Sequence, residues 1–224
     1  LAERYNGSGH GTIHSWIIGN EVNNNYPAHY QGNISADEFA TDYARQFRVC
    51  YNAIKSHNKD ARVYTNIDQR WNWIDRKSPL QYPSRTFLDK FAAVITETGN
   101  IDWGLTIHPH PVPMDNCRFW SIPHPYAKMN LVNHNNNSKF ATVQNMEVFT
   151  NHMKQPALLS PNGTVRHIMI TALGFNASEA SPYGSNEQYQ AAALVYAYKK
   201  AESLPEIEAF IIHKQHDDLS EAAS

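Results

Sequence analysis

The stretch Trp16-Ile17-Ile18-Gly19-Asn20-Glu21-Val22-Asn23 decides how the rest of the chain is interpreted. It opens as an apolar run and changes at Asn20 and Glu21 to an amide and a carboxylate. A short apolar run of this kind predicts a strand buried on both faces, as in a parallel sheet. In barrels of parallel strands, polar residues at the carboxyl end of a strand point into the active site. Asn20 and Glu21 are therefore candidate functional residues, although loops also commonly begin with polar residues.

Alternating strands and helices follow this stretch. The segment after Ser35 begins with a capping box completed by Glu38, which predicts the start of a helix. A second capping box at Ser185 and Gln188 predicts another helix, and Ser84 is predicted to cap a third. The predicted strands are 62–67, 101–107, 165–171 and 207–212, and the predicted helices are 35–57, 84–98, 142–154 and 185–204. This order predicts an α/β fold with a parallel sheet and helices outside it.

Composition limits the classes of function. The chain has 224 residues, of which 42% are hydrophobic, so we expect residues 1–224 to form part of one domain. Its formal net charge of −2 argues against a nucleic-acid partner. No apolar run reaches the roughly 18 residues needed to cross a bilayer, so no membrane partner is expected. The sequence predicts no cofactor.

The Gly19-Asn20-Glu21 motif resembles the fourth-strand motif of a large clan of retaining glycoside hydrolases with (β/α)8 TIM barrels, such as cellulases and β-galactosidases. In that clan the Asn binds the sugar 2-hydroxyl and the Glu is the general acid/base. The longer pattern, with His108-Pro109-His110-Pro111 downstream, also resembles an uncharacterised family of bacterial barrel proteins. The resemblance implies a poly- or oligosaccharide substrate, and with it a secreted or periplasmic location.

Under this resemblance the five predicted strands correspond to strands 4 to 8 of the barrel. Five strands cannot close such a barrel, and an open edge favours aggregation. We therefore expect the remainder of the barrel to come from residues outside this sequence. The alternative is an open, doubly wound five-stranded sheet.

A retaining glycosidase needs a second carboxylate about 5–5.5 Å from the first. The clan's nucleophile is a Glu at the end of strand seven, where this sequence reads Ile170-Thr171-Ala172-Leu173-Gly174. The resemblance therefore places Ala172 at the position of the nucleophile, and alanine cannot attack or ionise. Three interpretations remain: an engineered removal of the nucleophile, a natural pseudoenzyme, or a different register.

Two other carboxylates are weaker candidates for this role. Glu97, in Thr96-Glu97-Thr98-Gly99, looks like a nucleophile motif, but it falls at the end of a helix and thus at the opposite end of the barrel. We reject it as catalytic. Glu179 lies in the loop after Ala172 and is a minor alternative.

Histidines suggest a competing metal-dependent chemistry. His108 and His110 end the third predicted strand, where alternate residues can share a face and bind one metal ion. His213, His216, Asp217 and Asp218 follow the last strand and are candidate further ligands. We predict no metal and assign His108, His110 and His213 to substrate binding.

Aromatic and polar residues after the strands complete the predicted site. Trp71 and Trp120 are expected to pack against sugar rings, as are their neighbours Trp73 and Tyr126. Asn66 and Asp68 end the second predicted strand and are expected to bind sugar hydroxyls. The sequence thus predicts a glycoside hydrolase impaired or inactive at Ala172, with a carbohydrate-binding pseudoenzyme and a metal-dependent hydrolase as rivals.

Overall fold

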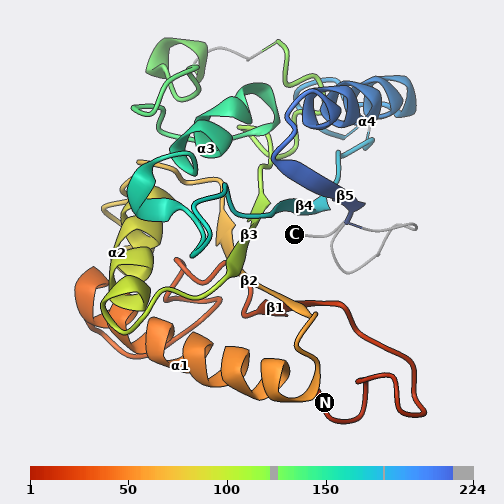
Figure 1. Ribbon diagram of the computed structural model, residues 1–224. Helices are drawn as coiled ribbons and strands as arrows, with labels where there is room; N and C mark the ends of the chain where they lie inside the picture. Colours follow the sequence, from red (N-terminus) through yellow and green to blue (C-terminus); the bar gives the residue numbers. More distant parts are fainter. Residues whose placement is uncertain (122–125, 179, 214–224) are drawn as a thin grey trace.

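A computed structural model of the chain describes residues 1–121, 126–178 and 180–213. It is a mixed α/β structure built on one five-stranded parallel sheet, shown in Figure 1. The strands are β1 (Ser15–Ile18), β2 (Arg62–Asp68), β3 (Trp103–His108), β4 (Ile168–Leu173) and β5 (Ile207–Ile212). The α-helices are α1 (Ala36–His57), α2 (Ser84–Glu97), α3 (Glu147–His152) and α4 (Glu187–Glu202). The 3-10 helices are η1 (Tyr126–Met129), η2 (Val143–Asn145) and η3 (Pro156–Leu158).

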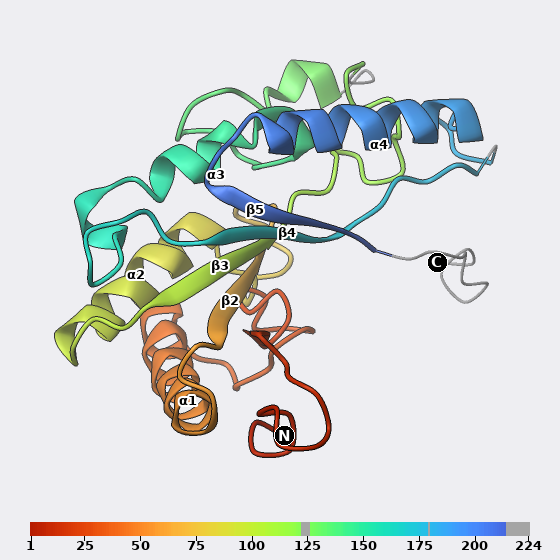
Figure 2. The same cartoon turned by 45° about the vertical axis from the view of Figure 1, so that its right-hand side comes forward.

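The strands are ordered β1-β2-β3-β4-β5, so each strand pairs with its neighbours in sequence. A doubly wound sheet requires the strand order to reverse at a switch point. No such reversal occurs among the five strands described, and the doubly wound alternative is therefore wrong for this sheet. In Figures 1 and 2 the α-helices follow one side of the fanned strands, as right-handed crossovers in a sequential sheet require.

The sheet is strongly curled, because side chains of non-adjacent strands meet across its inner face. Tyr64 and Arg62 of β2 both bind the carboxylate of Glu208 on β5, although β3 and β4 lie between these strands. Gly104 of β3 makes room for the Tyr64 ring, since a Cβ at Gly104 would lie 2.4 Å from two of its carbons. The five strands therefore form a half-barrel whose concave side is filled at the amino-terminal end.

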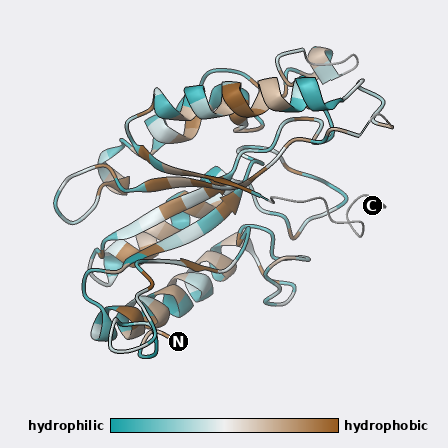
Figure 3. Cartoon of the chain, turned by 90° about the vertical axis from the view of Figure 1, so that its right-hand side faces the viewer, coloured by the Kyte–Doolittle hydropathy of each residue, from teal (hydrophilic) through white to brown (hydrophobic). Residues whose placement is uncertain are grey.

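The hydrophobic core lies between the sheet and the helices. Phe39 and Phe47 of α1 pack in one cluster with Phe91 of α2 and with Val63 and Leu105 of the sheet, all fully buried. Figure 3 shows hydrophilic and hydrophobic residues mixed along the helices, as expected of helices with one buried side. Among the described residues, no helix is both long and apolar enough to cross a membrane.

Helix ends test the sequence predictions in detail. The capping box of Ser35 and Glu38 is confirmed, with both reciprocal hydrogen bonds present. The other two predicted caps are wrong. Asn186, and not Ser185, caps α4, and Ser84 is the first residue of α2, where its hydroxyl binds Asp68. The short polar side chains in these segments all suit a cap, so the sequence alone does not choose among them.

Two predicted elements have different extents. The predicted helix 142–154 is split into the 3-10 turn η2 and the short helix α3. The predicted strand 165–171 begins only at Ile168, and the Arg166 side chain just before it binds the carbonyls of Leu158 and Trp103. It also extends past Thr171, so that Ala172 lies within β4.

Candidate functional site

The turn after β1 presents Glu21 at the carboxyl end of the sheet. Gly19 has φ of +84°, and a Cβ there would lie 2.5 Å from Val22 Cγ1, so the turn requires glycine. Glu21 itself has φ of 42°, in the left-handed region. The Asn66 side chain holds this backbone by accepting a hydrogen bond from the Glu21 N–H, and the backbone carbonyl of Asn66 accepts one from the Val22 N–H. The Glu21 carboxylate is thereby anchored above the end of β2.

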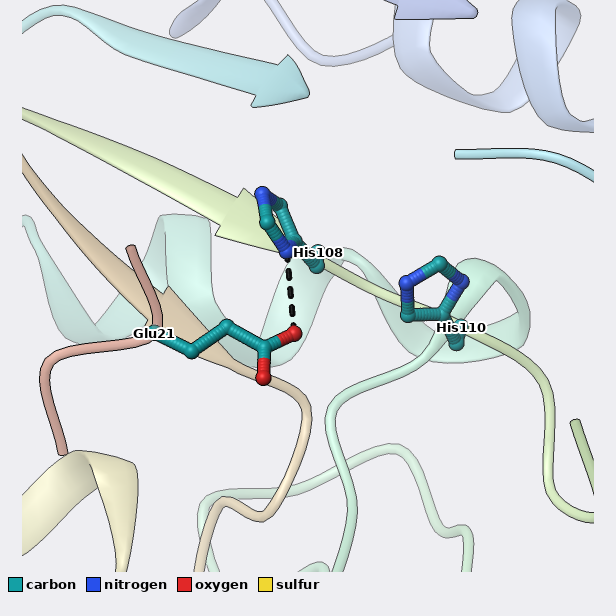
Figure 4. A group of neighbouring side chains, drawn as sticks. All are labelled: Glu21, His108 and His110. Carbon is teal, nitrogen blue, oxygen red and sulfur yellow. Dashed lines mark hydrogen bonds and ion pairs between the residues drawn. The ribbon is translucent and has the colours of Figure 1, made fainter. Parts of the chain in front are cut away.

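Two histidines from the end of β3 lie beside Glu21, as Figure 4 shows. His108 Nδ1 is 3.0 Å from Glu21 Oε1. The His110 ring meets the His108 ring edge to face, with centroids 5.9 Å apart. The His108 side chain is 8% exposed and that of Glu21 is 24% exposed, so the Glu21 side chain is partly open to solvent.

A buried polar network supports the other side of Glu21. Asn24 Nδ2 donates to Glu21 Oε2 at 3.1 Å and to Asp68 Oδ2 at 3.0 Å. Arg70 in turn binds Asn24 Oδ1 at 2.6 Å and Asp68 Oδ2 at 3.1 Å. Asn23 Nδ2 donates to Asp68 Oδ1. Both Glu21 oxygens therefore have fixed donors, which limits the rotamers that the side chain adopts.

These donors decide the charge of Glu21. Burial acts to raise the pKa of Glu21, but the His108 hydrogen bond and the nearby His108, His110 and Arg70 act to lower it. The net pKa lies below its ordinary value of 4.5. Glu21 is thus an ionised hydrogen-bond acceptor at neutral pH.

His110 is neutral at the same pH. Burial lowers its pKa to about 4, with the neighbouring His108 and His213 contributing in the same direction and Glu21 opposing them. His213 therefore lies close enough to His110 to influence its charge, as the sequence prediction of a shared site requires. Its backbone N–H binds the Leu173 carbonyl at 3.0 Å, which ties the end of β5 to the end of β4.

The same three side chains form a candidate metal centre. Glu21, His108 and His110 each offer one ligand atom, and these atoms lie within 4.8 Å of one another. A four-coordinate zinc ion at 2.0–2.2 Å from each ligand requires ligand atoms roughly 3.5 Å apart, so small side-chain shifts would be needed. A metal-binding histidine normally donates its second N–H to an acceptor. Here the partner of His108 Nε2 is the Nδ2 donor of Asn66 at 3.2 Å, which opposes metal binding through Nδ1.

Three predicted substrate-binding residues lie beneath the site and not in it. Asn66 and Asp68 are each 1% exposed, and their side-chain atoms bind other protein groups. Trp71 is fully buried, with its Nε1 on Asn136 Oδ1 and its ring against His152. Direct sugar contact by these three residues is therefore wrong for this structure. Their position next to strand ends was correct, but the side chains point inward.

The structure describes three further predicted residues, Asn20, Trp120 and Ala172. Asn20 is exposed next to Glu21. Trp120 is exposed, but its ring packs against Phe119 and near Tyr196 of α4, which places it over that helix. Ala172 lies in β4 at a register shift between β4 and β5, with φ of 54°. Glu179, His216, Asp217 and Asp218 lie outside the described residues.

Sequence reasoning missed Asn24 and Arg70. The signal was present as an Asn23-Asn24-Asn25 run directly after Glu21 and an arginine two residues beyond β2. Such residues are also ordinary in loops. Only the apposition of the β1 and β2 ends shows that Asn24 binds two carboxylates at once.

Comparison with known proteins places the chain by its sequence. A family model described as a family of unknown function, DUF5722, matches residues 1–224. The chain belongs to this family. The search of curated proteins found no match to this DUF5722 chain. The family assignment carries no activity, so the function of the DUF5722 site must be argued from its geometry.

Proposed function

We propose that this DUF5722 chain carries a carbohydrate-processing site of the retaining glycoside hydrolase type, on strands 4 to 8 of a (β/α)8 barrel. Glu21 is the acid/base, Asn20 binds the sugar 2-hydroxyl, and Ala172 occupies the place of the nucleophile. The observation that carries the proposal is the position of the Glu21 carboxylate. It is partly exposed at the carboxyl end of a curled parallel sheet and bound by His108 at the end of β3. Barrel enzymes have their active sites at that end.

Backbone strain supports the pairing of Glu21 with Ala172. Among the described residues, Glu21, Asn130 and Ala172 are the non-glycine residues with positive φ. Such conformations cost about 1–3 kcal/mol each and cluster at functional sites. The two positions proposed for the catalytic carboxylates are thus both held in this conformation, one in the turn after β1 and the other within β4.

The chemistry expected of the chain as it stands is incomplete. Alanine supplies no nucleophile, so the covalent glycosyl intermediate does not form. Glu21 is ionised, which suits a base but not the acid that protonates a leaving group. A second carboxylate near Glu21 would raise its pKa by like-charge repulsion. The site therefore binds sugar but lacks the double-displacement path. A carbohydrate-binding role for the unaltered chain is consistent with the proposal.

The direct test is to supply the missing carboxylate. Ala172→Glu is compared with Ala172→Gln, which has the same shape but no charge, on activated aryl glycosides and on a panel of oligosaccharides. We expect hydrolysis with retention of configuration only in Ala172→Glu. NMR of the anomer that forms first measures the configuration. In the unaltered chain, azide or formate is expected to restore partial turnover with inversion. Correctly folded Ala172→Glu with no turnover on any of these substrates would contradict the proposal.

The second candidate is a metal-dependent hydrolase, favoured by the grouping of Glu21, His108 and His110. Calorimetric titration of the chain with Zn²⁺, beside a His110→Gln variant, separates the two functions. The glycosidase proposal expects no saturable binding that depends on His110. Stoichiometric binding that is lost in His110→Gln would replace it with the metal-dependent function.

A further inference from the structure

Asn66 is 1% exposed, and its amide is completely used inside the protein. Its Oδ1 accepts the Glu21 N–H. Its Nδ2 lies 2.7 Å from Thr106 Oγ1 and 3.2 Å from His108 Nε2. One buried side chain thus touches both the backbone of Glu21 and the ring that binds the Glu21 carboxylate.

The orientation of this amide is fixed by its partners. The Glu21 N–H can only donate, so the atom that faces it must be the carbonyl oxygen Oδ1. The Thr106 hydroxyl donates to the Thr65 carbonyl at 3.2 Å, so toward Asn66 it is an acceptor. The NH₂ group therefore faces Thr106 and His108. A rotation of the amide by 180° would place two donors against each other at Glu21.

The amide orientation determines the tautomer of His108. A donor at Asn66 Nδ2 requires a bare Nε2, and a neutral imidazole then carries its proton on Nδ1. Nδ1 lies 3.0 Å from Glu21 Oε1, so the N–H donates to the carboxylate. We infer that Asn66 is a positioning residue that selects the Nδ1–H tautomer of His108, which in turn holds Glu21 as a hydrogen-bonded carboxylate.

This inference explains how a site with two histidines favours acid–base chemistry over metal binding. With its proton on Nδ1, His108 has no lone pair toward Glu21 and His110. The role assigned to Glu21 rests on the proposed function, whereas the tautomer of His108 does not. The role of Glu21 and the tautomer of His108 can therefore be tested independently, because the tautomer is measured without any substrate.

The experiment is ¹⁵N NMR of the full chain with ¹⁵N-labelled histidine rings, with His108 assigned by its loss in His108→Gln. At neutral pH we expect a protonated Nδ1 and a bare Nε2 at His108. A protonated Nε2 with a bare Nδ1 in the unaltered chain would overturn the inference.

Asn66→Asp tests the cause of the tautomer. Aspartate accepts the Glu21 N–H but presents only acceptors to His108, so Nε2 is expected to gain a proton. The matched control is Asn100→Asp, which adds the same charge before β3, where Asn100 Oδ1 binds Arg166. We expect the control to keep the Nδ1–H tautomer. An unchanged His108 in folded Asn66→Asp would show that Asn66 does not select the tautomer.

In the Ala172→Glu background, the same substitution gives a functional readout. Asn66→Asp is expected to lower kcat by about tenfold or more, to change KM by a smaller factor, and to shift the pH profile of kcat. If His108 carries its proton on Nδ1 but the Ala172→Glu protein is inactive, the inference about Asn66 stands and only the proposed function is contradicted.

Discussion

The two ends of the concave face of the sheet hold a carboxylate in opposite ways. At the amino-terminal end, Glu208 binds Arg62, Tyr64 and His167, so its charge is matched by the Arg62 guanidinium beside a phenol and an imidazole. At the carboxyl end, Glu21 accepts hydrogen bonds from His108 and the amide of Asn24. Arg70 donates to the Oδ1 of Asn24, on the other side of the same amide.

The difference is the one expected between a structural carboxylate and the proposed functional one. The cross-sheet bonds of Glu208 join β5 to β2 and stabilise the curl. Burial and Glu208 together raise the pKa of Tyr64 to about 12, so the phenol stays protonated and keeps donating. Glu21 instead is held by an imidazole and an amide on a strained backbone and is left partly exposed. A carboxylate that is held by hydrogen bonds and not by an arginine is suited to react with a ligand.

The largest expected effect compares these two carboxylates directly in the Ala172→Glu background. Glu21→Gln is expected to lower kcat/KM by about 10²–10⁴-fold, the usual contribution of a general acid or base. Glu208→Gln is expected to change kcat/KM less than about threefold and to lower the urea midpoint of unfolding instead. Steady-state kinetics and urea titration of both variants provide the check. A similar loss of activity in both would break the distinction between the two ends.

The pH dependence of stability is expected to arise at the carboxyl end. His110 has a pKa of about 4 in the folded chain and 6.5 as its ordinary value, so the unfolded chain binds more protons between these values. The free energy of unfolding therefore falls as the pH is lowered from about 6.5 to about 4, by at most about 3 kcal/mol.

The lowered pKa of Glu21 adds a further loss of stability below 4.5, since that carboxylate must then be protonated. Urea midpoints measured across this range check the expectation. His110→Gln is the comparison, and it should flatten the dependence between pH 4 and 6.5. An equally steep dependence in that variant would assign the effect to other groups.

Packing at the amino-terminal end is expected to be sensitive to a single methyl group. Gly104→Ala would place its Cβ 2.4 Å from the Tyr64 ring and 3.0 Å from the His167 carbonyl oxygen. Neither neighbour moves freely, so we expect a loss of about 1–3 kcal/mol in the free energy of unfolding. Gly174→Ala is the matched control, because its nearest atom is His213 Cβ at 3.5 Å, an ordinary contact. A neutral Gly104→Ala would show that the inner face is loosely packed.

The smallest expected effect concerns the strain at Ala172. Glycine adopts φ of 54° without the steric cost that alanine has, although it loses more entropy on folding. Ala172→Gly is therefore expected to raise the free energy of unfolding by up to about 1 kcal/mol. Ala177→Gly, at a half-buried position after β4, provides the control and is expected to lower it. A loss of stability in Ala172→Gly would contradict strain at this position.

The sequence by itself determined the order of elements and the end of the sheet where the candidate site lies. The apolar run before Asn20 and the alternating helices and strands require only local periodicity and a parallel sheet. For the same reason Glu21, His108 and His110 could be grouped in advance, since the carboxyl ends of parallel strands share one edge. The Ser35 capping box was likewise readable, because both of its partners lie within one helical turn.

Only the tertiary structure decided which polar side chains face a ligand and which lie beneath it. Asn66, Asp68 and Trp71 follow the same sequence pattern as exposed site residues, yet they are buried by contacts with Glu21, Asn24 and Asn136, which come from distant segments. The curl of the sheet depends in the same way on Tyr64 meeting Glu208, 144 residues away. Hydrogen-bond partners at such separations depend on how strand ends and loops meet in space, and no local pattern of residue types encodes that meeting.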